Sequence, residues 1–350
     1  MSNTWMGRSA RRMLILAIVP LTAAATTATA GGRDGRGGIC TRTAGLQKQA
    51  CFAELADDYL TTQAACINDP ENARDCLREA RWAREEMQDE CREQHEARRE
   101  FCEEVGEAAY APDLSPELFQ DPRSPSRPNA WFPLEVGSHW VYEEDGERIE
   151  IEILDATKRV GEIDCIVYRD TVTSHGLLVE DTDDWFGLRT NGDVEYCGEE
   201  VKDYEYFGGD DPEEPELVSI EGRFKAGVEL AKSGTAFLGT PVPGSHYRQE
   251  WDPGNAEDVG EVLSVDYAWG HDATLDELVP QALAELMCAD GDCVVIADRS
   301  LLDPSAFERK YYARGVGKFL ETKPEEGAFV PLVGCNVDPR CDALPIAGDE

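Results

Sequence analysis

The sequence predicts an α+β protein. A disulfide-stapled antiparallel helical hairpin precedes a mainly antiparallel β domain with one helix, folded as a curved sheet or open barrel. Three observations lead to this prediction: six cysteines in the first third of the chain are spaced symmetrically, a proline-rich segment follows them, and beyond it the apolar periodicity changes from helical to alternating. We therefore expect the hairpin at residues 38–109, a linker at 110–130, the β domain at 131–325 and an acidic tail with a small disulfide loop at 326–350.

Residues 1–30 have the pattern of a secretory signal peptide. Three arginines within residues 8–12 precede an apolar run over residues 13–25, and the small residues Ala28 and Ala30 predict cleavage near Ala30. No later apolar stretch approaches the roughly 18 to 20 residues that a helix needs to span a bilayer. The sequence thus predicts a secreted or periplasmic bacterial protein with no transmembrane segment in the mature chain.

The twelve cysteines are an even number, which in an exported chain predicts six disulfides rather than metal ligation or free thiols. The first six lie symmetrically about residue 71, as expected for two antiparallel helices whose turn lies there. The predicted hairpin disulfides are Cys40–Cys102, Cys51–Cys91 and Cys66–Cys76.

Each helix of the hairpin carries one apolar stripe at helical spacing, and Tyr59 on the first helix would face the small Ala83 on the second. Two helices alone bury too little apolar area to fold, so bridges worth roughly 2 to 4 kcal/mol each replace the missing core. We expect the hairpin to be a stalk or docking arm on which Trp82 and Phe101 are exposed.

The linker contains five prolines within residues 110–130, a density that prevents a helix and favours an extended spacer. In the β domain, Asp145-Gly146 and Asn191-Gly192 each separate two strand-like runs and predict tight hairpin turns. One helix is expected at residues 274–287, where the apolar side chains form one stripe. Further strands are expected at 164–172, 177–181, 183–190, 216–224, 246–251, 262–268, 294–301, 307–313 and 318–322.

Two segments near the ends of the β domain resemble a group of uncharacterised bacterial secreted and lipid-anchored proteins. The first is FPLEVGSHWVYE, which starts at Phe132, and the second is KYYARGVG, which starts at Lys310. The resemblance continues through VYRDTV and LVEDTDDW between them. It implies a shared β-sheet domain and no particular activity, and the N-terminal hairpin departs from the group's pattern.

The other six cysteines lie in the second part of the chain. Cys165 and Cys293 belong to segments of similar strand character, so we expect a cross-sheet bridge Cys165–Cys293. The pairs Cys197–Cys288 and Cys335–Cys341 would complete the set, which is one of fifteen possible connectivities.

Charge and motifs exclude several functions. A formal net charge of −38 repels phosphates, so nucleic acid is not an expected partner. The chain contains no GxSxG, HExxH or glycine-rich phosphate-loop motif, and no catalytic or cofactor-binding residue is predicted. We expect an exported, acidic, non-enzymatic binding or docking protein with an unknown protein or cell-envelope partner. The alternatives are an extracytoplasmic hydrolase without a recognisable motif and a ligand-free envelope or structural protein.

Calcium is the small partner that the acidic segments favour, because this cation binds six to eight oxygen ligands. Carboxylates gather at Asp181, Asp183 and Asp184, and again at Asp210 and Asp211 in a glycine-containing loop. Their spacing matches no EF-hand, and a solvated acidic surface is the competing interpretation.

Overall fold

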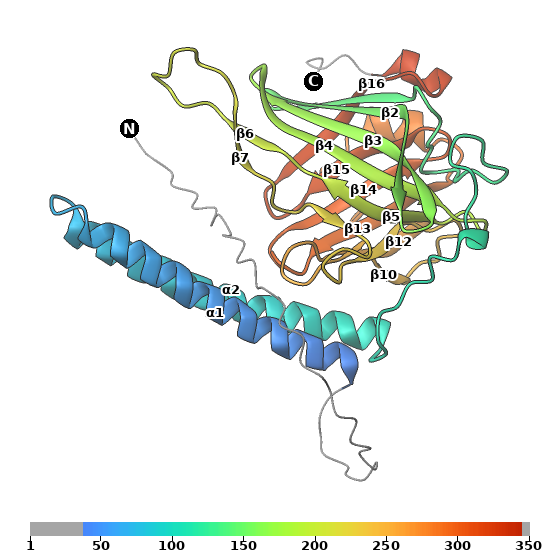
Figure 1. The fold of residues 1–350 in the computed structure, drawn as a ribbon. Coiled ribbons are helices and arrows are strands. Elements are labelled where there is room, and N and C mark those ends of the chain that lie inside the picture. The colour runs from blue at the N-terminus through green and yellow to red at the C-terminus, as the bar shows by residue number, and fades with distance from the viewer. Residues whose placement is uncertain (1–37, 345–350) are drawn as a thin grey trace, which may run out of the picture.

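The computed structural model describes residues 38–344 and confirms the predicted fold class. Two disulfide-stapled helices precede a mainly antiparallel sheet that is nearly closed into a barrel, and a further helix packs on that sheet (Figure 1). The predicted signal peptide and its cleavage site at residues 1–30, and the last six residues of the predicted tail, lie outside the described residues.

Helices α1 (Ile39–Ile67) and α2 (Ala73–Val105) form the predicted hairpin. In Figure 1 the turn between them projects well beyond the sheet, whereas the C-terminal part of α2 lies against it. All three predicted hairpin disulfides are confirmed, and their nearly equal Cα–Cα distances keep the two helices at a constant separation. These distances are 5.7 Å for Cys40–Cys102, 5.8 Å for Cys51–Cys91 and 5.6 Å for Cys66–Cys76.

The prediction of two exposed aromatic residues on the hairpin is wrong for one of them. Trp82 is 64% exposed, but Phe101 is only 6% exposed. Phe101 packs against Val259 and Leu301 of the β domain, and the Arg248 guanidinium lies 4.8 Å from its ring centroid. Phe101 is buried because the hairpin docks this side of α2 on its own sheet.

A buried ion pair fixes the docked hairpin. Arg98 of α2 donates from Nε to Glu257 Oε2 at 2.8 Å and from Nη2 to Glu257 Oε1 at 2.9 Å. The two side chains are only 4% and 3% exposed. Gln47 of α1 and the backbone N–H of Gly254 also donate to Glu257 Oε1, each at 2.6 Å. Both helices are therefore tied to the same carboxylate of the β domain.

The proline-rich linker runs along the sheet instead of forming a free spacer. The Tyr110 hydroxyl donates to the Ser233 carbonyl at 2.8 Å, and Phe119 forms a β-bridge with Arg189. The linker contains one short 3₁₀ helix, η1 (Pro116–Leu118), and is otherwise irregular, because its prolines disfavour a longer helix.

One continuous antiparallel sheet forms the β domain, with the strand order β10-β12-β13-β14-β15-β16-β1-β2-β3-β4-β5-β9-β11. The two ends of this order, β10 and β11, follow one another in the chain, so this segment nearly closes the sheet. The strands are β1 (His139–Glu144), β2 (Glu147–Val160), β3 (Ile163–Ser174), β4 (Leu177–Leu188), β5 (Val194–Glu200), β6 (Asp203–Glu205), β7 (Glu216–Ser219), β8 (Phe224–Lys225), β9 (Lys232–Phe237), β10 (His246–Arg248), β11 (Glu250–Trp251), β12 (Asp258–Tyr267), β13 (Cys293–Ser300), β14 (Phe307–Ala313), β15 (Gly317–Lys323) and β16 (Ala328–Cys335).

The predicted turn at Asp145-Gly146 joins β1 to β2, with φ values of 44° and 88° that suit a two-residue hairpin. The turn at Asn191-Gly192 joins β4 to β5 through the longer connection 189–193. The strands expected at 177–181 and 183–190 are the single strand β4, and that expected at 216–224 divides into β7 and β8. Strands β6, β9 and β16 were not predicted.

The helix expected at 274–287 is wrong over its first half, because α3 spans only Gln281–Met287. Pro280 is its N-cap, and proline disfavours a helical conformation at the residue before it. Leu278 adopts a φ of 62°, which also interrupts a helix. Of the predicted apolar stripe, Leu275, Val279 and Leu283 are nevertheless buried, whereas Ala282 is exposed, so the stripe predicted burial correctly only in part.

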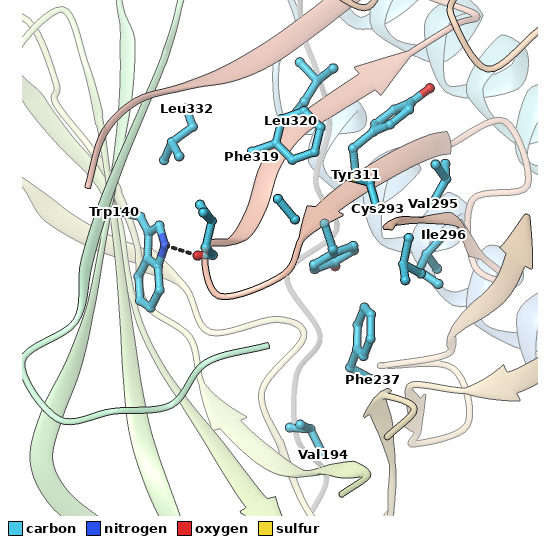
Figure 2. Packing of buried hydrophobic residues seen from close by; sticks show 14 of the residues in the cluster. Trp140, Val194, Phe237, Cys293, Val295, Ile296, Tyr311, Phe319, Leu320 and Leu332 are labelled. Atoms are coloured by element: carbon cyan, nitrogen blue, oxygen red, sulfur yellow. Dashed lines mark hydrogen bonds between the residues drawn. The ribbon is translucent and has the colours of Figure 1, made fainter. Parts of the chain in front are cut away.

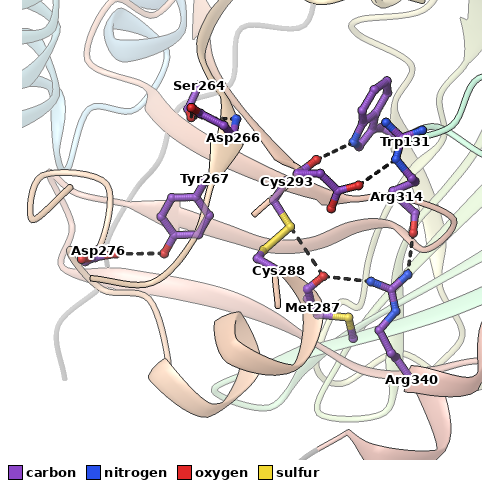
Figure 3. Close-up of a disulfide and its surroundings, with 11 residues drawn as sticks. Trp131, Ser264, Asp266, Tyr267, Asp276, Met287, Cys288, Cys293, Arg314 and Arg340 are labelled. Carbon is purple, nitrogen blue, oxygen red and sulfur yellow. Dashed lines mark hydrogen bonds and ion pairs between the residues drawn. A yellow bond between two sulfur atoms is a disulfide. The ribbon is translucent and has the colours of Figure 1, made fainter. Parts of the chain in front are cut away.

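The C-terminal segment belongs to the sheet and is not a free tail. Strand β16 pairs with β1 and β15, and the 3₁₀ helix η2 (Pro339–Ala343) follows it. The predicted Cys335–Cys341 disulfide is confirmed. Arg340 of η2 donates from Nη1 to the Met287 carbonyl at 2.8 Å and from Nη2 to the Arg314 carbonyl (Figure 3).

Two predicted disulfides, Cys165–Cys293 and Cys197–Cys288, are wrong. Cys165 pairs with Cys197, and Cys288 pairs with Cys293. The first bridge joins β3 to β5 and crosses the intervening strand β4 at Gly187. The absence of a side chain there makes room for the bridge, because a Cβ atom on Gly187 would lie only 3.3 Å from Cys197 Sγ. The second connects the end of α3 to the start of β13 (Figure 3). Both pairings depend on sheet register and chain path, which strand character alone does not specify.

The apolar core lies largely around β13, β14 and β15, where Tyr311, Phe319 and Leu320 are fully buried (Figure 2). The Trp140 indole N–H donates to the Val316 carbonyl at 2.7 Å and thereby links β1 to the β14–β15 turn.

None of the helices within residues 38–344 is both long and apolar enough to cross a membrane. All cysteines in this range are bridged, which fits an extracellular or periplasmic environment.

Candidate ligand-binding cavity inside the sheet

The inner face of the sheet surrounds a cavity of about 220 Å³. The register of the strands determines which side chains surround it. Tyr168 of β3 lies opposite Asp184 of β4, and Phe186 of β4 lies opposite Tyr196 of β5. Directly opposed residues of antiparallel strands project from the same face, so these four side chains share the inside of the sheet.

Aromatic rings form one wall of the cavity. Ring centroids are 6.4 Å apart for Trp140 and Tyr168, 5.3 Å for Tyr168 and Phe186, and 4.9 Å for Phe186 and Tyr196. Phe132, which precedes β1, packs edge-on against Phe186 at 5.2 Å. The wall is therefore a continuous aromatic surface, whose ring faces carry partial negative charge.

Two lysines also line the cavity, and each is already paired with a carboxylate. Lys310 Nζ lies 2.5 Å from Asp298 Oδ2 and 3.4 Å from Glu308 Oε2. Burial alone would lower the pKa of Lys310, but Asp298 and Glu308 outweigh it and raise this pKa well above its usual value. Lys318 Nζ lies 3.0 Å from Glu321 Oε2. Both positive charges are thus compensated inside the protein.

Further carboxyl groups at the cavity have no such compensation. Glu250 and Asp258 line the cavity, and the Tyr196 hydroxyl donates to Asp184 beside it. Burial raises the pKa of Glu250, and the nearby charges of Asp258, Glu199 and Asp184 raise it further. Burial likewise raises the pKa of each of these three neighbours. The positive charge of Lys310 opposes these shifts at Glu250 and Asp258, but burial and the neighbouring acids outweigh it.

Two buried polar atoms near the cavity have no hydrogen-bond partner among residues 38–344: Asp170 Oδ1 and Tyr247 Oη. Asp170 is the next inward-facing residue of β3 after Tyr168. Tyr247 is 9% exposed and lies opposite Gly260, which in turn lies opposite Asp298. Leaving such a group unsatisfied costs about 1 to 3 kcal/mol, so the cavity margin has unmet hydrogen-bonding capacity.

We expect Asp170→Asn to stabilise the protein increasingly as pH rises. Burial raises the pKa of Asp170 from 3.8 to about 7, so the folded protein binds a proton there that the unfolded chain has lost. The stability contributed by this proton is complete below roughly pH 4 and disappears as pH rises through about 7. Urea unfolding of both proteins at several pH values measures the difference in free energy of unfolding. The exposed Asp155→Asn variant is the control, and a difference that stays constant or shrinks with rising pH contradicts the expectation.

The structure does not bring the five predicted calcium ligands together. Asp181 accepts hydrogen bonds from Arg169 at 2.9 and 3.0 Å on the outer face of β4, which it shares with Asp183. Asp184 projects to the inner face, because successive strand residues point to opposite sides. Asp210 and Asp211 lie in the exposed loop between β6 and β7. Within residues 38–344, no group of three or more His, Cys, Asp or Glu side chains is arranged to hold a metal ion.

The sequence analysis named Asp184 only as a calcium ligand and missed the other inner carboxylates, although a local signal exists for some of them. Asp170 follows Tyr168 by two residues, and Asp184 precedes Phe186 by two, so an acid and a ring share one strand face in each case. The alternation of inward and outward residues along β3 and β4 could therefore have indicated that the inside of the sheet is both aromatic and acidic. Glu250 and Asp258 carry no comparable signal, because only sheet closure brings them to the cavity.

No protein-family model matches the chain, and no curated protein and no solved structure is significantly similar to it.

Proposed function

We propose that the protein is an exported, non-enzymatic binding protein that holds a small ligand inside its β domain. The observation that carries this proposal is the cavity of about 220 Å³ lined by aromatic rings and charged groups. For comparison, an apolar cavity of about 150 Å³ is enough to hold one benzene molecule. A buried aromatic surface with a few polar groups is the usual composition of a small-molecule site.

Solvent access supports ligand entry. Phe132, Tyr168, Glu250 and Asp258 line the cavity and remain partly accessible to solvent, so it is not sealed inside the core. Its walls come from a disulfide-bridged sheet, which supports a largely preformed site and a low ordering cost on binding.

The residue types favour binding over hydrolysis. Among the described residues that line the cavity there is no serine, threonine, cysteine or histidine, so a hydroxyl or thiol nucleophile with a histidine base is not available there. Both lysines are held in ion pairs. The hydrolase alternative therefore gains no support from this site.

The proposal is tested with three probes of nearly identical shape: choline, 3,3-dimethyl-1-butanol and 3,3-dimethylbutanoate, which are positive, neutral and negative. Trp140 lines the cavity, so its indole N–H signal reports binding by NMR, while that of the exposed Trp82 reports non-specific effects. We expect at least one probe to shift the Trp140 signal and leave Trp82 unchanged. The proposal fails if no probe shifts the Trp140 signal at probe concentrations up to about 10 mM. A dissociation constant of that size corresponds to a binding free energy of only roughly 3 kcal/mol.

Filling the cavity should abolish this binding. Ala236 lines the cavity, and Ala236→Phe places a ring where the probe would lie. Ala156→Phe is the matched control, because Ala156 is a partly buried alanine of the outer-face cluster around Trp185. We expect the first variant to lose the Trp140 response and the second to keep it. Equal responses would show that the probes bind elsewhere.

The calcium expectation is addressed in the same spectra. Calcium bound at the acidic segments would shift backbone signals near Asp181 or Asp210, and a chelator would reverse these shifts. No response there would contradict calcium binding without affecting the cavity proposal.

A further inference from the structure

We propose that the ligand of the cavity is a small organic ammonium ion, held by the aromatic wall and by the carboxylates of Glu250 and Asp258. This inference rests on the proposed function, that the cavity is a binding site, and adds the chemical class of its ligand.

The charge distribution around the cavity is the first argument. Lys310 and Lys318 are each neutralised by carboxylates at 2.5 and 3.0 Å. Glu250 and Asp258 line the same cavity, and neither forms a salt bridge with any residue in the range 38–344. Asp184 adds a further acid next to Tyr196. The site therefore has more carboxyl groups than positive charges, and a bound cation would balance the surplus.

The aromatic wall is the second argument, and it is independent of the acids. Trp140, Tyr168, Phe186 and Tyr196 present a continuous set of rings to the cavity. A cation within about 6 Å of such a ring is attracted by its quadrupole, most strongly when it is desolvated. Rings supply no oxygen ligands for a hard metal ion but suit an ammonium group with attached carbon atoms.

Unmet hydrogen bonding is the third argument. Tyr247 Oη and Asp170 Oδ1 are buried on the inner face of the sheet and have no hydrogen-bond partner among the described residues. Both atoms can accept a hydrogen bond. They lie behind the cavity lining, so they add acceptors, not donors, to the surroundings of the ligand, and an anion in the cavity would meet Glu250 and Asp258 with repulsion.

The matched probes separate charge from shape. Choline and 3,3-dimethyl-1-butanol differ mainly in one positive charge, and cation–π attraction alone at a desolvated site predicts at least about a tenfold difference. We expect choline to bind at least tenfold more tightly than the alcohol, and 3,3-dimethylbutanoate not to bind. A fourth probe, 3,3-dimethylbutylamine, distinguishes a primary from a quaternary ammonium group.

Variants assign the effect to the cavity acids. Glu250→Gln should weaken choline binding about fivefold to tenfold and leave binding of the neutral alcohol unchanged, because only the charge is removed. The variant should also be at least as stable as the wild type at about pH 8, since a buried acid is replaced by a neutral group. Asp183→Asn, which neutralises an acid on the outer face of β4, is the control and should leave both affinities unchanged.

The outcomes distinguish the two proposals. Equal affinity for choline and its neutral counterpart, or preference for the carboxylate, overturns the ammonium inference and leaves the binding function intact. No response of Trp140 to any probe overturns both. A choline preference that is undiminished in both Glu250→Gln and Asp258→Asn also overturns the inference, because the cavity acids would then play no part.

Discussion

Replacing Arg98 by methionine is expected to lower the free energy of unfolding by about 3 to 5 kcal/mol, because Glu257 would remain buried without its counter-charge. The two side chains are 4% and 3% exposed and share two hydrogen bonds of 2.8 and 2.9 Å. Gln47 and Gly254 would still donate to Glu257, but neither carries a positive charge. Urea unfolding followed by circular dichroism measures the loss.

Two further variants identify the cause. Arg98→Met combined with Glu257→Gln should recover most of the lost stability, because the amide keeps an acceptor oxygen for Gly254 and leaves no buried charge. Arg92→Met removes an exposed arginine whose partner Asp89 is also exposed, and should cost less than about 1 kcal/mol. If Arg98→Met costs no more than Arg92→Met, the ion pair does not hold the hairpin on the sheet.

The hairpin was predictable from the sequence because its information is local. Cysteine spacing about residue 71 and helical periodicity together specify which residues of two neighbouring helices meet. The docked side of α2 was not predictable. Arg98 and Phe101 belong to a highly charged helix, and their burial depends on Glu257 and Val259, which are more than 150 positions away.

The positions of most strands were predictable from the sequence, but the closure of the sheet was not. Alternation identifies which residues share a face of one strand, but pairing between distant strands decides what they meet. Cys165 meets Cys197 because both flank Gly187 on the intervening strand β4. The cavity has the same origin, since Glu250 reaches the rings of β3, β4 and β5 only when β11 pairs with β9.

Removing the Cys51–Cys91 bridge is expected to open the outer half of the hairpin while the β domain stays folded. Within residues 51–91, the only buried side chains are those of Leu55, Cys66, Ala80 and Cys91, so this part of the hairpin has almost no apolar core. Loss of one such bridge costs about 2 to 4 kcal/mol. The open population should therefore rise on the order of a hundredfold in a variant with both cysteines replaced by serine.

Trypsin measures this opening directly, because Arg74, Arg78, Arg81 and Arg84 all lie in the outer half. Cleavage there should accelerate in proportion to the open population when opening is fast relative to cleavage. Serine replacement of Cys335 and Cys341, which removes a bridge of sequence separation 6 at the other end of the fold, should leave this rate unchanged. If the Cys51 and Cys91 variant is cleaved no faster than the wild type, contacts between α1 and α2 are sufficient to hold the helices together. The symmetric cysteine spacing would then not be what stabilises the projecting hairpin.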